Sequence, residues 1–597
     1  MNKVSLATAF LCLMLTNEVR ADLQSALWDT DIVERLESSG LGLSDLFPTP
    51  NQQTADLKRN PFYLSIVEHL KNDLTALQKA DPKLSVTMAT SHRLFNIAWL
   101  KSNNSFFELA GIVNRADRQP FHQSSSCGEI RLIYRLAYTV LEKGHDIHSR
   151  LPFTINMVFV PPSESVSFKG CEKHVKNWET FLHSAKKGET SEIKRLLGID
   201  STSLKSVEIN MQSVRWPSTT RGDLAAHAEY LLRVFRIVDG RMQLASLENT
   251  PDVDRIKSTP ALKQSLISWI KENLEGINTG TATAPEEFLA KKATSVSPRG
   301  LSRRANRPWS GIFKPEDFAQ VDFKKLTYIK SPAALLRRLD DSSCAGCHQN
   351  RSVAGFHLLG VDRKGTSAFN SLAVPGSPHF MNDLNRRAVY LESLKNGGKP
   401  DIFRPFSERT LTEAGEAGAH CGLGDPGFST WTCSAELRCQ SYGLESGDKT
   451  VGQCFSAGKV SDVGEPCEIG TMIPDTNPHK DKVKHTQNRS CSNNGICEEN
   501  YVGFPEGMCA VSCDSKSKQM NCGSIALLFE FNNCLGKGLP FTKCLAENTR
   551  PAGLRICSTD IPCRDDYICA GPPEKAGTCI PPYFLFQMRV DGHPKPT

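Results

Sequence analysis

The chain has 597 residues, 71 basic and 65 acidic side chains, a formal net charge of +6 and 39% hydrophobic residues. This length predicts about two to four domains, each with a core of its own. So mild a positive charge argues against a nucleic-acid partner. Beyond the N-terminus no run of about eighteen apolar residues occurs, so the sequence predicts no integral membrane protein.

The N-terminus has the three parts of a secretory signal peptide. Lys3 is followed by a mostly apolar run from Val4 to Leu15 and then by Val19-Arg20-Ala21, a small-residue cleavage site. We expect residues 1–21 to be removed after Ala21. The mature protein is then periplasmic or extracellular, where disulfide bonds persist.

Residues 22–277 have the pattern of a mixed α and β domain. Apolar residues recur at helical spacing over 61–79 and 266–274. Apolar and polar residues alternate over 130–138 and 207–212, and 153–160 is a further strand. Asp239-Gly240 joins two strand-like runs, which is typical of a hairpin turn. We expect an α+β fold with an antiparallel sheet.

Residues 278–312 are rich in Thr, Ala, Ser and Pro and carry several lysines and arginines. This composition predicts a solvated basic linker. A flap whose arginines contact anionic groups of a cofactor or an acidic partner is the alternative.

Residues 344–348 read Cys-Ala-Gly-Cys-His. This C-x-x-C-H spacing is a signature for covalent attachment of c-type haem, in which Cys344 and Cys347 form thioethers to the vinyl groups. His348, next in the chain, then supplies the proximal ligand to the iron. A small disulfide loop or half of a zinc site are the alternatives for these residues.

The sixth ligand of the iron decides the chemistry. Met381 and His379 follow the irregular sequence Pro375-Gly376-Ser377-Pro378, which favours a loop that presents a distal ligand. As the distal ligand we favour Met381 slightly over His379. His357 lies only nine residues past His348, so its side chain would reach across the ring with difficulty. Methionine would raise the reduction potential, a second histidine would lower it, and an absent ligand would leave the iron open to peroxide or dioxygen.

Residues 313–405 resemble a c-type cytochrome domain. They combine the motif with a short helix over 333–339, opened by Pro332, and with later candidate ligands, although only Cys344, Cys347 and His348 match specifically. The resemblance implies a small, mostly helical segment with one covalent haem c. It also implies a redox partner protein or a small-molecule oxidant, and electron transfer or haem-dependent oxidoreductase activity.

Most of the 21 cysteines lie in residues 421–579, in a repeated pattern. The repeats are Cys433-x5-Cys439-x14-Cys454, Cys491-x5-Cys497-x11-Cys509 and Cys563-x5-Cys569-x9-Cys579, each with a further cysteine upstream at Cys421, Cys467 and Cys557. In spacing these units resemble EGF-like or dickkopf-like modules. The resemblance implies disulfide-stapled repeats that display loops to a surface or a protein ligand, followed by a C-terminal tail at 580–597.

Cys127 and Cys171 stand alone in the first half of the mature chain, which predicts a disulfide between them. Two functions therefore remain open from the sequence. One is an exported mono-haem redox protein with a disulfide-rich recognition region. The other is a secreted disulfide-rich binding protein in which the C-x-x-C-H motif is structural.

Overall fold

The structure is a computed structural model of the whole chain. It describes residues 23–50, 56–86, 92–122, 126–142, 144–161, 168–217, 225–297, 300–361, 363, 375–409, 414–441, 449–492, 495–498, 507–510, 555–558, 561–570, 577–580, 590 and 593–597. The expected signal peptide at 1–21 lies outside these residues, as do Cys513, Cys522, Cys534 and Cys544.

The first 400 residues hold the α-helices and the long strands. The helices are α1 Thr30–Leu36, α2 Leu43–Leu46, α3 Pro61–Ala80, α4 Glu172–Lys187, α5 Ile193–Leu197, α6 Val253–Ser258, α7 Pro260–Glu272, α8 Leu274–Thr279, α9 Pro332–Ser342, α10 Cys344–Cys347 and α11 Pro378–Lys395. The strands are β1 Ala26–Leu27, β2 Leu84–Ser85, β3 His92–Leu94, β4 Ser105–Arg115, β5 Glu129–Glu142, β6 His145–Phe159, β7 Leu204–Pro217, β8 Ala225–Val238, β9 Arg241–Ala245 and β10 Ala293–Ser297.

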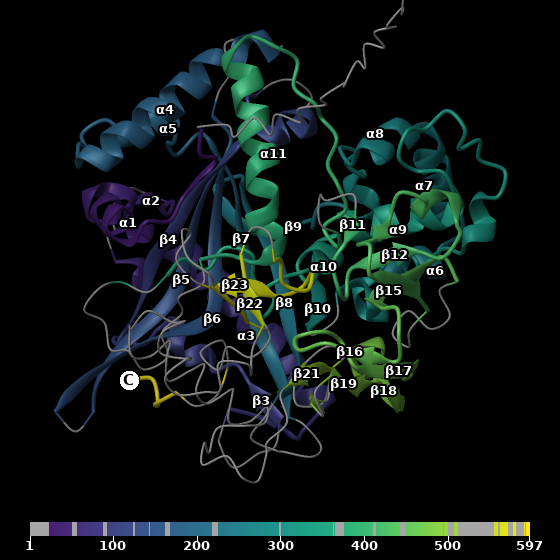
Figure 1. Cartoon of the computed structure of the whole chain (residues 1–597). Coiled ribbons are helices and arrows are strands. Elements are labelled where there is room, and N and C mark those ends of the chain that lie inside the picture. Colours follow the sequence, from purple (N-terminus) through teal and green to yellow (C-terminus); the bar gives the residue numbers. More distant parts are fainter. Residues whose placement is uncertain are drawn as a thin grey trace, which may run out of the picture.

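These strands form one ten-stranded sheet, which is the centre of the molecule (Figure 1). Its order is β1-β4-β5-β6-β7-β3-β2, and β8 continues it from β7 to β9 and β10. Every pair is antiparallel except β2 with β3. The predicted hairpin at Asp239-Gly240 joins β8 to β9, and both turn residues have positive φ, as a tight hairpin requires.

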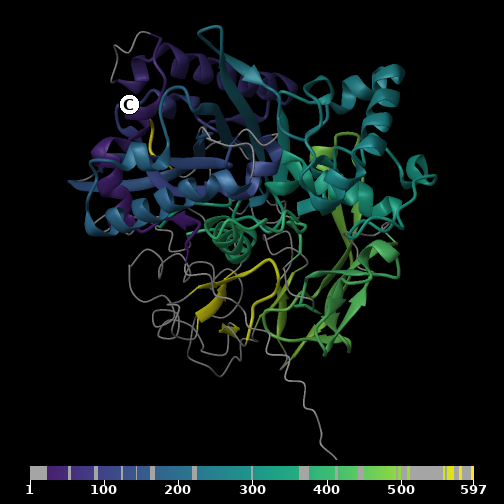
Figure 2. The ribbon, with the colours of Figure 1, turned by 90° about the horizontal axis from the view of Figure 1, so that it is seen from above.

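The two faces of the sheet have different partners. Helix α3 packs on one face, and α11 and the cysteine-rich strands lie on the other (Figure 2). Helix α10 lies on this second face too, where its two cysteines line a cavity together with residues of β7. Because side chains alternate along a strand, Val207 and Met211 of β7 enter the large core with α3, whereas Glu208 and Asn210 point to the α10 side. The sheet is therefore covered on both faces.

The predicted α+β class is confirmed, with helices and antiparallel strands in the body and a disulfide-rich C-terminal region. The helices of the segment 313–405 share their cores with the rest of the body. Leu335 and Leu339 of α9 pack with Leu266 and Ile270 of α7, while Leu391 of α11 joins the core of the first domain.

The stretch 278–312, expected as a basic linker or flap, is corrected by the structure. It includes β10, which pairs with β8 over the register Ala293↔Leu232 to Ser297↔Ala228. Its small alternating residues fit a closely packed edge, and Ser295 is fully buried. Arg303 is buried too and donates to the carbonyl oxygen of Asp481.

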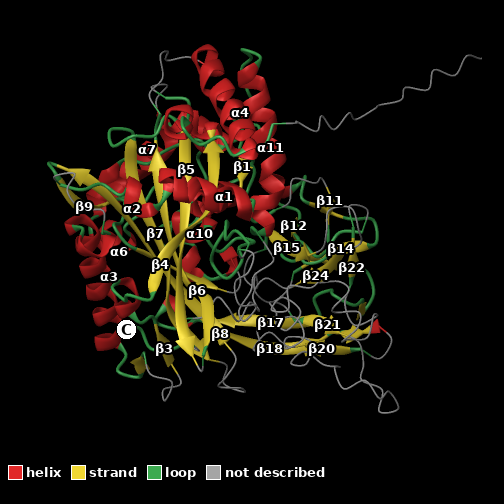
Figure 3. Ribbon diagram, turned by 90° about the vertical axis from the view of Figure 1, so that its left-hand side faces the viewer, coloured by secondary structure: helices red, strands yellow, loops and turns green. Residues whose placement is uncertain are grey.

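The C-terminal region is built of short strands. They are β11 Ala414–Gly415, β12 His420–Gly422, β13 Thr432–Cys433, β14 Leu437–Gln440, β15 Val451–Ser456, β16 Val460–Ser461, β17 Glu468–Ile473, β18 Lys482–Asn488, β19 Ser490–Cys491, β20 Ile496–Glu498, β21 Met508–Ala510, β22 Ile556–Cys557, β23 Ile568–Ala570 and β24 Gly577–Ile580. In Figure 3 they lie beside the long strands of the body.

The repeated cysteine pattern corresponds to a repeated disulfide pattern. In each of the three units the first cysteine pairs with the third and the second with the fourth: Cys421–Cys439 and Cys433–Cys454, Cys467–Cys497 and Cys491–Cys509, Cys557–Cys569 and Cys563–Cys579. The predicted Cys127–Cys171 disulfide is also present. These bonds fit an exported or extracellular protein.

The cysteine-rich units pack against the body through specific contacts. Phe428 and Val451 of the first unit enter the core around α9. Arg304 pairs with Asp481 of the second unit at 2.8 Å, and Arg351 pairs with Asp565 of the third at 3.4 Å. In the part of the chain that the structure describes, no helix combines the length and apolarity needed to cross a bilayer.

We expect the Cys127–Cys171 bond to stabilise the body strongly, because it closes a loop of 44 residues between two core positions. Replacing both cysteines with alanine should lower the free energy of unfolding by about 4 kcal/mol, the chain-entropy value for such a loop. Urea unfolding under non-reducing conditions measures this change. The matched C557A/C569A variant opens a loop of only 12 residues, so its free energy of unfolding should fall by less. An unchanged urea midpoint for C127A/C171A would contradict the expectation.

Candidate functional site

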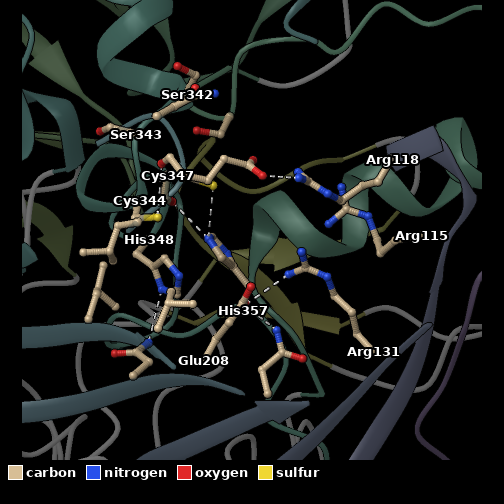
Figure 4. A pocket seen from close by; sticks show the side chains of 18 of the residues that line it. Arg115, Arg118, Arg131, Glu208, Ser342, Ser343, Cys344, Cys347, His348 and His357 are labelled. Atoms are coloured by element: carbon tan, nitrogen blue, oxygen red, sulfur yellow. Dashed lines mark hydrogen bonds and ion pairs between the residues drawn. The ribbon is translucent and has the colours of Figure 1, made fainter. Parts of the chain in front are cut away.

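The C-x-x-C-H motif forms one helical turn between α9 and the sheet. Helix α10 begins after Ser343, whose hydroxyl accepts a hydrogen bond from the backbone N–H of Gly346 at 3.0 Å and donates to the carbonyl oxygen of Asp340. His348 ends the turn. Because the turn is capped at its start, both cysteines and the histidine are held in a fixed orientation (Figure 4).

Gly346 lets this turn approach α9 closely. A Cβ atom at this position would lie 2.2 Å from the carbonyl oxygen of Asp340 and 3.0 Å from a methyl group of Leu301. Any larger residue would push the turn away. The carboxyl group of Asp340 accepts hydrogen bonds from the backbone of Trp309 and Ser310, and burial raises its pKa to about 6.

Cys344 and Cys347 are free thiols. Both are partly accessible because they line a cavity, and Cys344 Sγ lies 3.5 Å from the carbonyl oxygen of Glu248. Desolvation by the surrounding protein raises the pKa of Cys344 to about 12 and that of Cys347 to about 11. Neither is the low-pKa thiolate of a nucleophile or redox dithiol.

The alternatives of a disulfide loop and of half a zinc site find no support in this geometry. The two sulfur atoms are not bonded to each other. Among the described residues, groups of three metal-ligating side chains occur only at cysteines that are already in disulfides.

His348 is oriented by the sheet and by the loop that follows it. Its Nδ1 lies 3.2 Å from Nδ2 of Asn210 in β7, and the carbonyl oxygen of Gly355 hydrogen-bonds the ring. Gly355 has φ +82°, and a Cβ there would lie 2.6 Å from the ring of Tyr230. Desolvation lowers the pKa of His348, so the imidazole is neutral and can offer a lone pair to a metal.

Two more histidines continue from His348 in a row. The ring of His357 is 5.7 Å from that of His348 and 5.1 Å from that of His379. Both nitrogens of His357 have partners, because Nδ1 lies 2.8 Å from Ser377 Oγ and Nε2 lies 3.0 Å from the carbonyl oxygen of Cys347. Desolvation lowers the pKa of His357 to about 3 and holds that of His379 well below its usual value.

The predicted loop at 375–381 is partly a helix. Helix α11 starts at Pro378, with Ser377 as its cap, so both distal candidates lie in the first turn of a helix. His379 lines the cavity, and among the described residues its imidazole has no hydrogen-bond partner. Met381 is 37% exposed and does not line the cavity. The structure thus brings His379 to the motif and leaves Met381 at the surface.

The cavity beside the motif has a volume of about 310 Å³, within the range of small-molecule and cofactor sites. One part of its wall is apolar and comes from the sheet, the segment after β9, the loop after the motif and α11: Val113, Ile133, Leu232, Leu247, Phe356, Leu358 and Phe380. Another part is rich in arginine, and the guanidinium groups of Arg115, Arg118 and Arg131 point toward the side of His357 (Figure 4).

Charged residues of the sheet are paired where they meet beside the cavity. Glu129 is fully buried and contacts Arg118, Arg131 and Lys205 at 3.1, 2.6 and 2.9 Å. These cations hold the pKa of its carboxyl group well below the usual range despite desolvation. Two further carboxylates, Glu248 on Arg118 and Glu208 on Arg131, complete a network with equal numbers of cations and anions.

Sequence reasoning missed the residues that the sheet contributes. The alternating pattern places Asn210, Glu208 and Arg131 at the polar positions of half-buried strands, which ordinarily face solvent. Their alternation was predicted correctly, but only the packing of α10 and α11 shows that this face is enclosed. Comparison with known proteins adds no relative, because no family model, curated protein or solved structure matches the chain.

We expect both thiols of the folded chain, with no cofactor attached, to resist alkylation at pH 7. A rise in pKa from 9.0 to about 11 lowers the thiolate fraction of Cys347 roughly 100-fold, and that of Cys344 falls further. Iodoacetamide labelling followed by peptide mass spectrometry gives the rate at each cysteine. The same chain unfolded in denaturant is the control, and equal rates in the folded and unfolded chains would contradict the prediction.

Proposed function

We propose that the protein carries one covalent haem c at Cys344, Cys347 and His348 and acts as an exported redox protein. One observation carries this proposal: two free thiols and a neutral imidazole project from a single capped turn into a cavity of about 310 Å³. A purely structural motif would need neither the free thiols nor the adjacent space.

The residues around the motif fit a haem group. The apolar wall suits the face of a porphyrin, and the protonated thiols suit addition to vinyl groups more than metal chelation. Asn210 and Gly355 orient His348, in the way that partners of a metal-bound histidine fix its ring and its tautomer. When bound, the haem would supply a one-electron Fe(III)/Fe(II) couple.

We further propose His379, rather than Met381, as the second protein ligand. The imidazole of His379 faces the cavity without a hydrogen-bond partner among the described residues, whereas both nitrogens of His357 are engaged and Met381 is turned to the surface. Two histidine ligands favour a low reduction potential and electron transfer over reaction with dioxygen or peroxide. The partner is then a redox protein or a small oxidant.

The first test is attachment of the haem. Chain made with a working haem-attachment system should show a pyridine haemochrome spectrum of the c type that survives acid–acetone extraction. The C344A/C347A variant should show no haem absorption after the extraction, because both thioether bonds are gone. Wild-type protein that is colourless under these conditions would end the redox proposal and leave the secreted binding protein as the reading of the sequence.

The second test separates the two distal candidates. H379A should convert a carbon-monoxide-insensitive ferrous spectrum into one that shifts on adding carbon monoxide, and H379M should raise the midpoint potential by on the order of 100 mV. M381A is the matched control, since Met381 lies on the same turn of α11 but faces away. If M381A gives the carbon monoxide response and H379A does not, His379 is not the ligand.

A further inference from the structure

Beside Cys347, the cavity has a second charged group that the proposed haem site does not use. It consists of four arginines arranged around two buried carboxylates, and we call it the arginine cluster: Arg115, Arg386, Arg387 and Arg404 with Asp117 and Asp383. Arg115 ends β4, two of the arginines lie on α11, and Arg404 lies on the segment after it.

The ion pairs of the cluster are unequal. Asp117 accepts from Arg115 Nε at 2.8 Å and from Arg386 Nη2 at 2.7 Å. Asp383 accepts from Arg386 Nε and Arg387 Nε, both at 2.6 Å. Arg404 comes no closer than 3.9 Å to Asp117. Arg404 is therefore attached to the cluster only weakly.

The cluster holds more positive than negative charge. In its printed ion pairs, four guanidinium groups meet two carboxylates, which leaves an excess of two positive charges among these paired groups. The neighbouring network around Glu129 is balanced, with three cations and three carboxylates. Uncompensated buried charge is costly, so the excess points to an anion that is bound there when the protein works.

Unused hydrogen-bond donors lead to the same conclusion. Among the described residues, Arg386 Nη1 and Arg404 Nε are buried and have no hydrogen-bond partner, and Arg404 lines the cavity. Arg387 is 5% exposed and lines the cavity, and its Nε donates to Asp383. Desolvation, followed by repulsion from Arg115, lowers the pKa of Arg387 to about 10 and that of Arg404 to about 9.

The location distinguishes this cluster from a site for haem propionates. Arg404, Arg115 and Arg387 all lie close enough to Cys347 to lower the pKa of its thiol, against the larger effect of desolvation. A thioether at Cys347 would hold a vinyl group of the proposed haem at this position, whereas haem propionates lie on the edge of the ring opposite the vinyl groups. Arg387 also acts on the imidazoles of His357 and His379. The cluster thus adjoins the vinyl edge and the histidine row.

We propose that the arginine cluster is a binding site for a free, doubly charged oxyanion of the phosphate or sulfate class. Guanidinium groups bind such anions through paired N–H···O hydrogen bonds, and two negative charges match the excess of the cluster. Aromatic rings hold two of the arginines in place, with Arg404 over Phe121 and Arg387 over Phe380. The site depends on the fold of the body and not on haem.

Isothermal titration calorimetry of the full-length holoprotein with sodium sulfate, and separately with inorganic phosphate, tests the proposal at constant ionic strength. We expect one anion to bind per chain. The affinity for the anion should be about tenfold or more weaker in R387Q and in R404Q, because each variant loses charged hydrogen bonds to the anion. R236Q is the matched control. Arg236 lines the same cavity but pairs with the exposed Glu286, outside the cluster. The affinity of R236Q for the anion should therefore stay within about twofold of the wild-type value.

R404Q keeps the test decisive if R387Q fails to fold, since Arg404 makes the weakest ion pair of the cluster. Equal affinity of wild type, R387Q and R404Q would overturn the proposal, as would no binding to any form of the protein. Binding to the haem-free C344A/C347A chain but not to holoprotein would also overturn it and assign the cluster to haem propionates. The haem spectrum is read independently, so a colourless protein that binds sulfate would end only the redox proposal.

Discussion

The enclosure of one face of the central sheet is the constraint on which the rest of the structure depends. Strands β4, β5, β7 and β8 place charged and amide side chains on the side that α10, α11 and the cysteine-rich units cover. A charged group that is removed from water must be paired with an opposite charge, or its pKa shifts so that the group becomes neutral. The Glu129 network is the first response, and the neutral state of the three histidines is the second.

The same enclosure explains the state of the motif. The thiols of Cys344 and Cys347 are protonated because the surrounding protein desolvates them and disfavours their thiolates, and desolvation keeps the imidazole of His348 neutral. A neutral imidazole is what a metal ligand needs, and unreactive thiols are protected from adventitious oxidation. The capped turn and Gly346 fix these groups in place, which would lower the ordering cost of binding the proposed haem.

The cysteine-rich units take part in this arrangement as structural neighbours of the site. The third unit holds Arg351 through Asp565, and the carbonyl oxygen of Arg351 accepts a hydrogen bond from the backbone N–H of His379 at 3.3 Å. Arg351 also has φ 48°, an unfavourable conformation for a residue with a side chain, which the ion pair helps to hold. The units therefore support the loop between the histidines in addition to any display of their own loops.

Local patterns in the sequence determined much of this protein. The helix at α3, the β8–β9 hairpin, the Cys127–Cys171 bond and the repeated cysteine units follow from periodicity, turn residues and spacing, all of which act over short distances or through covalent bonds. The C-x-x-C-H turn likewise follows from the spacing of residues that are close together in the sequence. Only the tertiary structure decided that β10 joins the sheet, that His379 rather than Met381 faces the motif, and that Asn210 reaches His348 from far along the chain. A strand pattern shows which residues share a face but not what covers that face, because packing between distant segments sets burial, and burial sets the charge state of every group in the cavity.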